Sequence, residues 1–185
     1  MAYDFSGFKE EAANYKEWLS REYTGINTGR ATPAVLDLVS VENFGARMAV
    51  PHIASIIGED QRTLRVSPWD KSNIKLIEKA INDANLGLSV SVDEAGLRVS
   101  FPQLTEERRH ALVKVLKEKL EEARVKLRLL REDALKDLEV KEKEGGMGED
   151  EKFRHKEELQ KLVDEWNTAL EETFRKKEKD VMGIL

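Results

Sequence analysis

The chain has 185 residues, of which 36% are charged and 40% hydrophobic, and its formal net charge is −5. It has no cysteine, which excludes disulfides, thiolate nucleophiles and cysteine-ligated zinc, and its few prolines and glycines (4 and 11) favour long exposed helices over a loop-rich enzyme. The N-terminus carries no secretory or transit signal and no stretch approaches about 18 apolar residues, so we expect a cytoplasmic protein with no membrane partner.

A first helix is predicted from about residue 4 to residue 28. Asp4 or Ser6 could cap its start, and Gly29 followed by Pro33 ends it. Its apolar side chains recur every three or four positions, as on one face of a helix: Phe5, Phe8, Ala12, Tyr15, Leu19 and Ile26, with Trp18 and Tyr23 alongside. A helix with one apolar stripe needs partners elsewhere in the chain.

The pattern changes between residues 31 and 104. Apolar, β-rich runs at 38–44, 53–57 and 64–66 precede a short helical pattern at 74–84, and alternating residues at 88–92 and 97–101 flank a hairpin turn at 94–96. This composition predicts a small β/α/β domain, residues 31–104, inserted between helices.

Two short, proline-marked connectors would join this domain to the rest of the chain. One consists of Ala31, Thr32 and Pro33, and the other of Pro102, Gln103 and Leu104. Paired connectors of this kind predict a hinge. A rigid elbow is the alternative, and the sequence barely separates the two.

The last eighty residues predict two long helices. Thr105 is a good N-cap for the first, and Gly145, Gly146 and Gly148 separate it from a second helix that opens with Glu149. Their apolar seams are Val113, Leu116, Leu120, Ala123, Leu127, Leu130, Ala134 and Leu138, and then Leu159, Leu162, Val163, Trp166, Leu170, Phe174 and Val181. Residues 1–30 and 105–185 therefore predict a long antiparallel three-helix bundle, and the fold class is α+β.

Basic residues concentrate on the first of these two helices. Residues 105–131 hold nine Lys or Arg against five Asp or Glu, a net +4 within a chain of net −5. A helical wheel places Lys117, Arg124, Arg128 and Arg131 on one flank, interrupted by Glu121 and roughly 90–100° from the apolar seam. This basic ridge could bind phosphates, or it could be a solvated face paired with acids of a neighbouring helix. Composition alone favours the solvated face.

No catalytic or metal-binding motif is found. His52, His110 and His155 fall in three different predicted elements, and HExxH, GxSxG, Walker and GxGxxG patterns are absent. The GGMG run at 145–148 is interpreted as a turn between helices. We therefore expect no enzyme activity, no metal and no cofactor.

Several segments together resemble the ribosome recycling factor family in order and spacing. They are TGRATPAVLD (28–37), RTL (62–64), PWDKS (68–72), IEKAI (77–81), LGL (86–88), PQLTEERR (102–109), EEARVKLRLLREDA (121–134) and the acidic GEDE that opens the last helix. The resemblance covers nearly the whole chain. It implies a three-helix domain and a small β/α/β domain joined by two flexible strands in an L shape.

The resemblance also implies a role in translation termination. Such a factor binds the post-termination ribosome, lays its helical domain against large-subunit ribosomal RNA and works with elongation factor G. GTP hydrolysis by elongation factor G then drives separation of the subunits and release of mRNA and tRNA. The factor itself is not an enzyme, and we expect a monomer.

Carried over by motif, Arg131 is the candidate for the family's main RNA-contacting arginine. Arg124, Arg128 and Lys117 share its ridge, and Arg30 lies at the hinge end of the first helix. Asn27 and Glu132 depart from basic residues common in the family, which predicts fewer phosphate contacts and a shallower salt dependence of binding. The alternative function is a coiled-coil adaptor or chaperone whose ridge binds an acidic protein surface.

Overall fold

A computed structural model of the chain describes residues 3–43 and 45–183. Contacts between Cα atoms divide it into two compact units. The bundle unit is Met1–Tyr23 with Val113–Lys179, and the sheet unit is Thr24–Leu112 with Asp180–Leu185. The domain boundaries expected from the sequence, after residues 30 and 104, stay a prediction.

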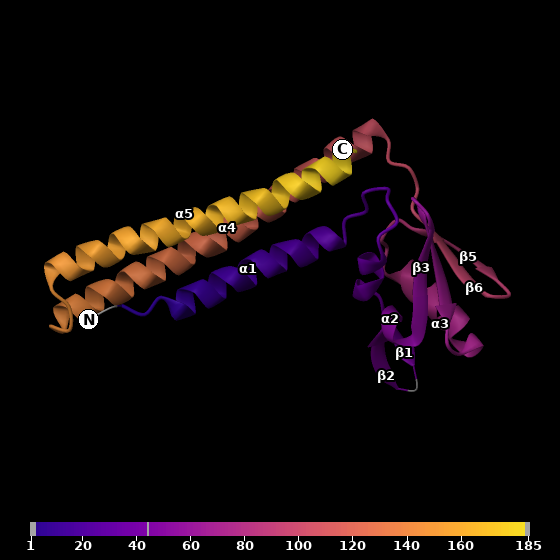
Figure 1. Cartoon of the computed structure of the whole chain (residues 1–185), viewed down its shortest axis with the longest axis horizontal. Helices are drawn as coiled ribbons and strands as arrows, with labels where there is room; N and C mark the ends of the chain where they lie inside the picture. The colour runs from indigo at the N-terminus through magenta and orange to yellow at the C-terminus, as the bar shows by residue number, and fades with distance from the viewer. Residues whose placement is uncertain (1–2, 44, 184–185) are drawn as a thin grey trace. The chain divides into compact units, whose positions relative to one another are not determined.

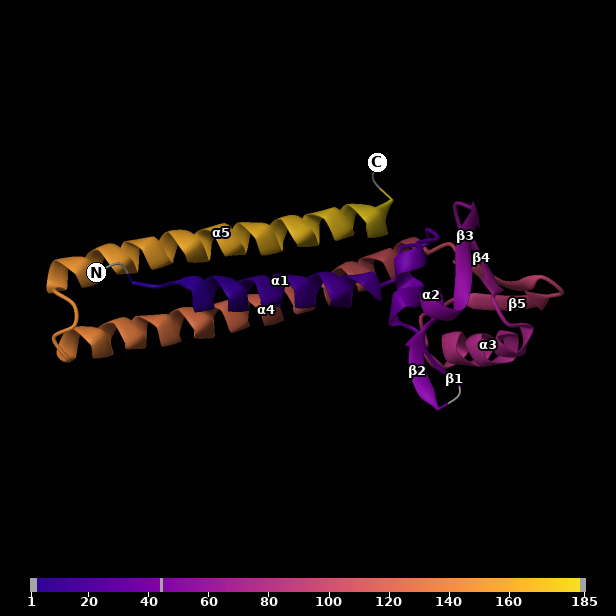
Figure 2. The ribbon, with the colours of Figure 1, turned by 60° about the horizontal axis from the view of Figure 1, so that its bottom comes forward.

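The bundle unit is built from α1 (Ser6–Thr24) and from most of α4 (Glu106–Lys143) and α5 (Glu149–Met182), which lie side by side (Figures 1 and 2). The Tyr3 hydroxyl near the start of α1 donates to Asp137 late in α4, and the Tyr23 hydroxyl at the other end donates to the Leu116 carbonyl. These two bonds show that α1 and α4 run antiparallel. Cross-links between α4 and α5 show the same for that pair, since Arg124 meets Glu171 whereas Lys152 meets Glu142.

The predicted apolar seams form the core of the bundle. Their most buried members are Phe8, Ala12 and Leu19 on α1, Leu116, Leu120, Ala123, Leu127 and Leu138 on α4, and Leu159, Val163, Leu170 and Phe174 on α5. Thr105 accepts a hydrogen bond from the Arg108 N–H through its hydroxyl, so the predicted cap of α4 is confirmed. The predicted α+β class, with long helices and a small β-containing part, is also confirmed.

The first helix is shorter than predicted. It ends at Thr24 rather than near residue 28, and Gly25 follows. The Asn27 side chain then accepts a hydrogen bond from the Gly29 N–H at 2.7 Å, which stabilises a turn in place of another helical turn. Ile26, counted with the helix from its spacing, therefore lies beyond it.

The sheet unit contains a four-stranded antiparallel sheet in the order β3 (Ala54–Asp60), β4 (Thr63–Pro68), β6 (Gly96–Ser100) and β5 (Ser89–Asp93). The helix α3 (Ile74–Asp83) buries Ile77 and Ile81 in one core with Leu64, Val66 and Val99 of the sheet. A separate pair of strands, β1 (Ser40–Asn43) and β2 (Ala46–Ala49), belongs to the same unit.

Four short elements of this unit were not predicted. They are the 3₁₀ helices η1 (Pro33–Leu38) and η2 (Lys71–Asn73), the four-residue helix α2 (Val50–Ile53) and the strand β2. Proline occupies the first or second position of both η1 and α2, where its missing N–H costs no helical hydrogen bond. Since η1 includes Leu38, the strand predicted over 38–44 begins later than expected, as β1 at Ser40; residue 44 lies outside the described residues.

The two proline-marked connectors lie within the sheet unit. The Ala31 N–H donates to the Gln61 carbonyl at 2.9 Å, and the Phe101 N–H donates to the Arg62 carbonyl at 2.7 Å. Gly29 has φ +78°, and a Cβ there would lie 3.5 Å from the Pro102 carbonyl oxygen. The β3–β4 turn thus bonds to Ala31 of the first connector and to Phe101, the residue just before the second, and the hinge itself stays a prediction.

Candidate nucleic-acid interface

The basic ridge of α4 includes two freely exposed cations. Lys117 and Arg128 are both exposed, and across the described part of the chain neither takes part in an ion pair or hydrogen bond. Their charges are therefore available to a polyanion without breaking an interaction. Lys114, which the sequence reasoning left out, is also exposed and unpaired among the residues described. Lys114 lies three residues before Lys117, about one helical turn away, and this spacing could have added it to the predicted binding residues.

Arg131 is half-buried against α5 and keeps its charge. Its Nε donates to the Gln160 side-chain oxygen at 3.2 Å. An amide orients the guanidinium but carries no charge to offset it. Arg131 is therefore a positioned cation, with other N–H groups still able to donate.

Arg124 is held by carboxylates. Its Nη1 lies 2.7 Å from Glu121 Oε1 on the same helix, and its Nη2 lies 2.7 Å from Glu171 Oε2 on α5. Arg124 therefore fits the interpretation of the ridge as a solvated face paired with acids. Lys117, Arg128 and Arg131, which have no carboxylate partner among the described residues, fit the interpretation of the ridge as a phosphate-binding surface. The four predicted residues share a flank of α4 but differ in the charge that they present.

The opposite flank of α4 uses its basic residues for packing against α1. The Lys126 ammonium sits 3.6 Å from the centre of the Trp18 ring, and Lys119 lies 3.3 Å from Glu22. The Glu22 carboxylate, by hydrogen bonding, raises the pKa of Lys119, so this lysine is firmly charged but already paired. Positive charge free for a ligand is thus concentrated on the flank nearer α5.

Arg30, the remaining predicted binding residue, belongs to the sheet unit. Its side chain is exposed, and no interaction within the described residues engages it. It follows the turn built by Asn27 and Gly29 and precedes the hydrogen-bonded Ala31. The backbone on both sides of Arg30 is therefore fixed by hydrogen bonds.

The family model "Ribosome recycling factor" matches residues 19–182 of the chain. The chain belongs to the ribosome recycling factor family. Among its curated relatives are the ribosome-recycling factors of Symbiobacterium thermophilum (42% identical over 168 residues) and Heliobacterium modesticaldum (44% over 168 residues), each match covering 91% of both chains. The predicted resemblance is therefore confirmed, with the role in translation that it implied.

Solved structures of family members agree with this fold. A solution structure of a ribosome recycling factor is 33% identical, with a TM-score of 0.79 and full coverage of both chains. A second, 38% identical with a TM-score of 0.67 over 97% of both chains, comes from models of the T. thermophilus ribosome recycling factor and the E. coli elongation factor G bound to the E. coli post-termination complex. The similarity extends over both units of the chain.

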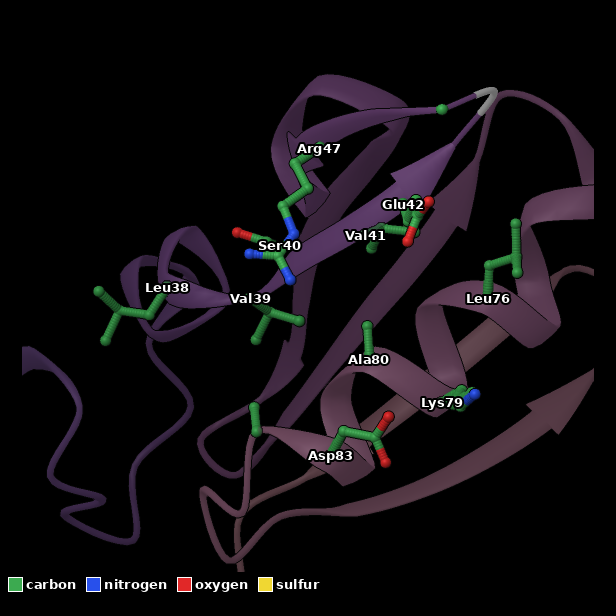
Figure 3. Close-up of a pocket in the computed structure, with 12 residues that line it drawn as sticks. Leu38, Val39, Ser40, Val41, Glu42, Arg47, Leu76, Lys79, Ala80 and Asp83 are labelled. Atoms are coloured by element: carbon green, nitrogen blue, oxygen red, sulfur yellow. The ribbon is translucent and has the colours of Figure 1, made fainter.

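Ribosome recycling factors are non-enzymatic translation factors, so the prediction that this chain is not an enzyme is confirmed. A hollow of about 650 Å³ in the sheet unit has an apolar floor that includes Val39, Val41 and Ala80 (Figure 3). Glu42 and Asp83 lie around this floor, and the residues that line the hollow include no cysteine or histidine.

The three histidines have separate surroundings. His52 is exposed, and His110 is 3.9 Å from Glu106 on the surface of α4. The ring centre of His155 is 5.9 Å from that of Tyr3 and 6.2 Å from that of Phe5. The described side chains form no group of three or more potential metal ligands. Over the same residues, no helix is long and apolar enough to cross a lipid bilayer.

Proposed function

We propose that this protein binds the post-termination ribosome and, with elongation factor G and GTP hydrolysis by that factor, promotes its dissociation into subunits with release of mRNA and tRNA. The observation that carries this proposal is similarity along the entire chain, since recycling factors 36–44% identical match 88–98% of it. The post-termination complex of one structural neighbour supports the choice of partners. Because its partner is the ribosome, we expect the protein to act in the cytoplasm. We also expect it to act as a monomer.

The ribosomal partner of the bundle would be large-subunit RNA. Lys117, Arg128 and Arg131 supply uncompensated positive charge along one flank of α4, and arginine suits phosphate because its planar fork donates two parallel hydrogen bonds. Arg30 would add a contact from the sheet unit. The connectors at Ala31–Pro33 and Pro102–Leu104 would form the hinge between the two predicted domains.

Subunit separation tests the proposal directly. Purified protein with elongation factor G and GTP should convert post-termination ribosomes into subunits, read as a shift in a sucrose gradient. With a known recycling factor active in the same assay, persistence of intact ribosomes would reject the function. Co-sedimentation that survives nuclease digestion of the RNA would instead favour an adaptor that binds an acidic protein surface.

A charge-removal pair tests the interface. Arg131→Ala should weaken ribosome binding about ten- to a hundredfold, since a charge-assisted contact is worth roughly 1.5–3 kcal/mol. Its melting temperature should hardly change, because surface substitutions usually stay within about 0.5 kcal/mol. The matched control is Arg21→Ala, which removes an exposed arginine whose one ion-pair partner among the described residues is Glu17 on its own helix. Equal weakening by both variants would contradict a localised interface.

A further inference from the structure

Glu171 of α5 is the centre of an ionic cluster at the basic ridge. Its Oε2 is 2.7 Å from Arg124 Nη2 and its Oε1 is 3.1 Å from Arg175 Nε, while Arg124 also meets Glu121 at 2.7 Å. The cluster therefore contains two carboxylates around the Arg124 guanidinium. Among the ridge cations, Arg124 alone has carboxylate partners in the described structure.

The two carboxylates do not hold Arg124 equally. Glu171 reaches it from another helix, and the side chains of this pair are only 30% and 34% exposed, so water and salt screen their attraction less than on an open surface. Glu121 is three residues away on the same helix and its side chain is 61% exposed. Such open pairs within one helix contribute little. Glu171 is therefore the main competitor for this guanidinium.

We propose that Glu171 sets the affinity of the basic ridge for RNA by withholding Arg124 from phosphate. This inference rests on the proposed function for the identity of the natural ligand. A phosphate that approaches Arg124 must displace a carboxylate already bonded to it, and it meets the repulsion of Glu171 and Glu121 as it does so. The ridge thus offers RNA the charges of Lys117, Arg128 and Arg131, and Arg124 serves to tie α4 to α5.

Glu171→Gln tests this, with Glu172→Gln as a matched control. Both remove one negative charge at adjacent positions of α5, but Glu172 is exposed and has no partner among the described side chains. Glutamine keeps the size of the side chain and can still accept from Arg124. Binding of each variant to poly(U) RNA and to ribosomes is measured from about 50 to 200 mM KCl, the range over which phosphate contacts change affinity steeply.

The expected result for Glu171→Gln is one additional phosphate contact. The plot of log affinity against log salt should steepen by about 0.7 for single-stranded RNA, which corresponds to roughly fivefold tighter binding near 0.1 M salt. Glu172→Gln should leave the slope unchanged. In an Arg124→Gln background, Glu171→Gln should no longer tighten binding, because the ridge cation that it releases is absent. Arg175, the other partner of Glu171, is already 70% exposed and open to phosphate in the wild-type protein.

Two outcomes overturn the inference: equal behaviour of Glu171→Gln and Glu172→Gln, or tightening that persists without Arg124. Circular dichroism checks that each variant keeps the helical signal of the wild-type protein. Should Glu171→Gln unfold, Glu121→Gln repeats the test from the other carboxylate, with Glu118→Gln as its control, because Glu118 has no partner among the described residues. Glu121→Gln should tighten binding less than Glu171→Gln would, and no tightening at all would refute the inference. Poly(U) binding does not depend on subunit separation. A wild-type protein that fails to split ribosomes would therefore reject the proposed function alone.

Discussion

The buried hydroxyl of Tyr23 makes a measurable link between α1 and α4. Tyr23 is 3% exposed, and its hydroxyl donates to the Leu116 carbonyl at 2.7 Å. Tyr23→Phe keeps the ring and removes this bond, which should lower the free energy of unfolding at pH 7 by about 1 kcal/mol. For a protein of this size, that loss lowers the melting temperature by roughly 2–4 °C.

The same hydroxyl should make the wild-type protein sensitive to alkali. Burial, followed by the nearby Glu171 carboxylate, raises the pKa of Tyr23 well above its ordinary value of 10.0, so the folded protein keeps a proton that the unfolded chain releases. Stability from the neutral hydroxyl is complete below pH 10 and falls as pH rises further. Linkage gives a loss of about 0.8 kcal/mol at pH 10.5 and about 1.4 kcal/mol at pH 11.

These magnitudes predict that the wild-type protein is the more stable at neutral pH and Tyr23→Phe the more stable at high pH. The wild-type advantage of about 1 kcal/mol should vanish between roughly pH 10.5 and 11, above which Tyr23→Phe becomes the more stable protein. Urea unfolding followed by helical circular dichroism at a series of pH values measures the difference. The other tyrosines are common to both proteins and cancel. A difference that stays constant from pH 7 to about 11.5 would refute the assignment of a buried neutral hydroxyl to Tyr23.

Further substitutions test the packing of each unit. Leu127→Ala, at a side chain 2% exposed, should lower the free energy of unfolding by about 2–5 kcal/mol, whereas Leu129→Ala two residues on, 54% exposed, should change it by less than about 0.5 kcal/mol in the same urea titration. Gly96→Ala should destabilise the sheet unit by about 1–3 kcal/mol, because φ is +145° and the added Cβ would lie 2.3 Å from the Val66 carbonyl oxygen. Gly58→Ala, with no atom within 4 Å of its Cβ, should cost no stability, and hydrogen exchange of the sheet amides separates the two.

The bundle could be predicted from the sequence in most of its detail because its signals repeat. Each long helix carries many apolar residues at one spacing. One wrongly assigned residue therefore hardly changes which face of the helix is predicted to be buried. The end of α1 is a different case. It depends on one side chain, since Asn27 bonds to the Gly29 N–H instead of leaving the backbone to continue the helix.

The sheet unit was predicted less completely because its elements are short. The strand β2 and the helix α2 span four residues each, fewer than a periodic pattern needs to distinguish helix from strand. Val50 and Ile53 of α2 are buried in the same core as the long strands, so their apolar character was visible. Their backbone conformation depends on Pro51 and on contacts from residues distant in the sequence.

The candidate interface shows where a helical wheel stops being informative. Arg124, Arg128 and Arg131 share a flank of α4, yet their charges are offset differently because α5 runs antiparallel alongside and places its own residues opposite them. Position 171 is a glutamate and neutralises Arg124, 47 residues away in the chain. Position 160 is a glutamine, which accepts from Arg131 without offsetting its charge. The electrostatic character of the face on α4 is therefore determined by side chains of α5, which no periodicity within α4 can reveal.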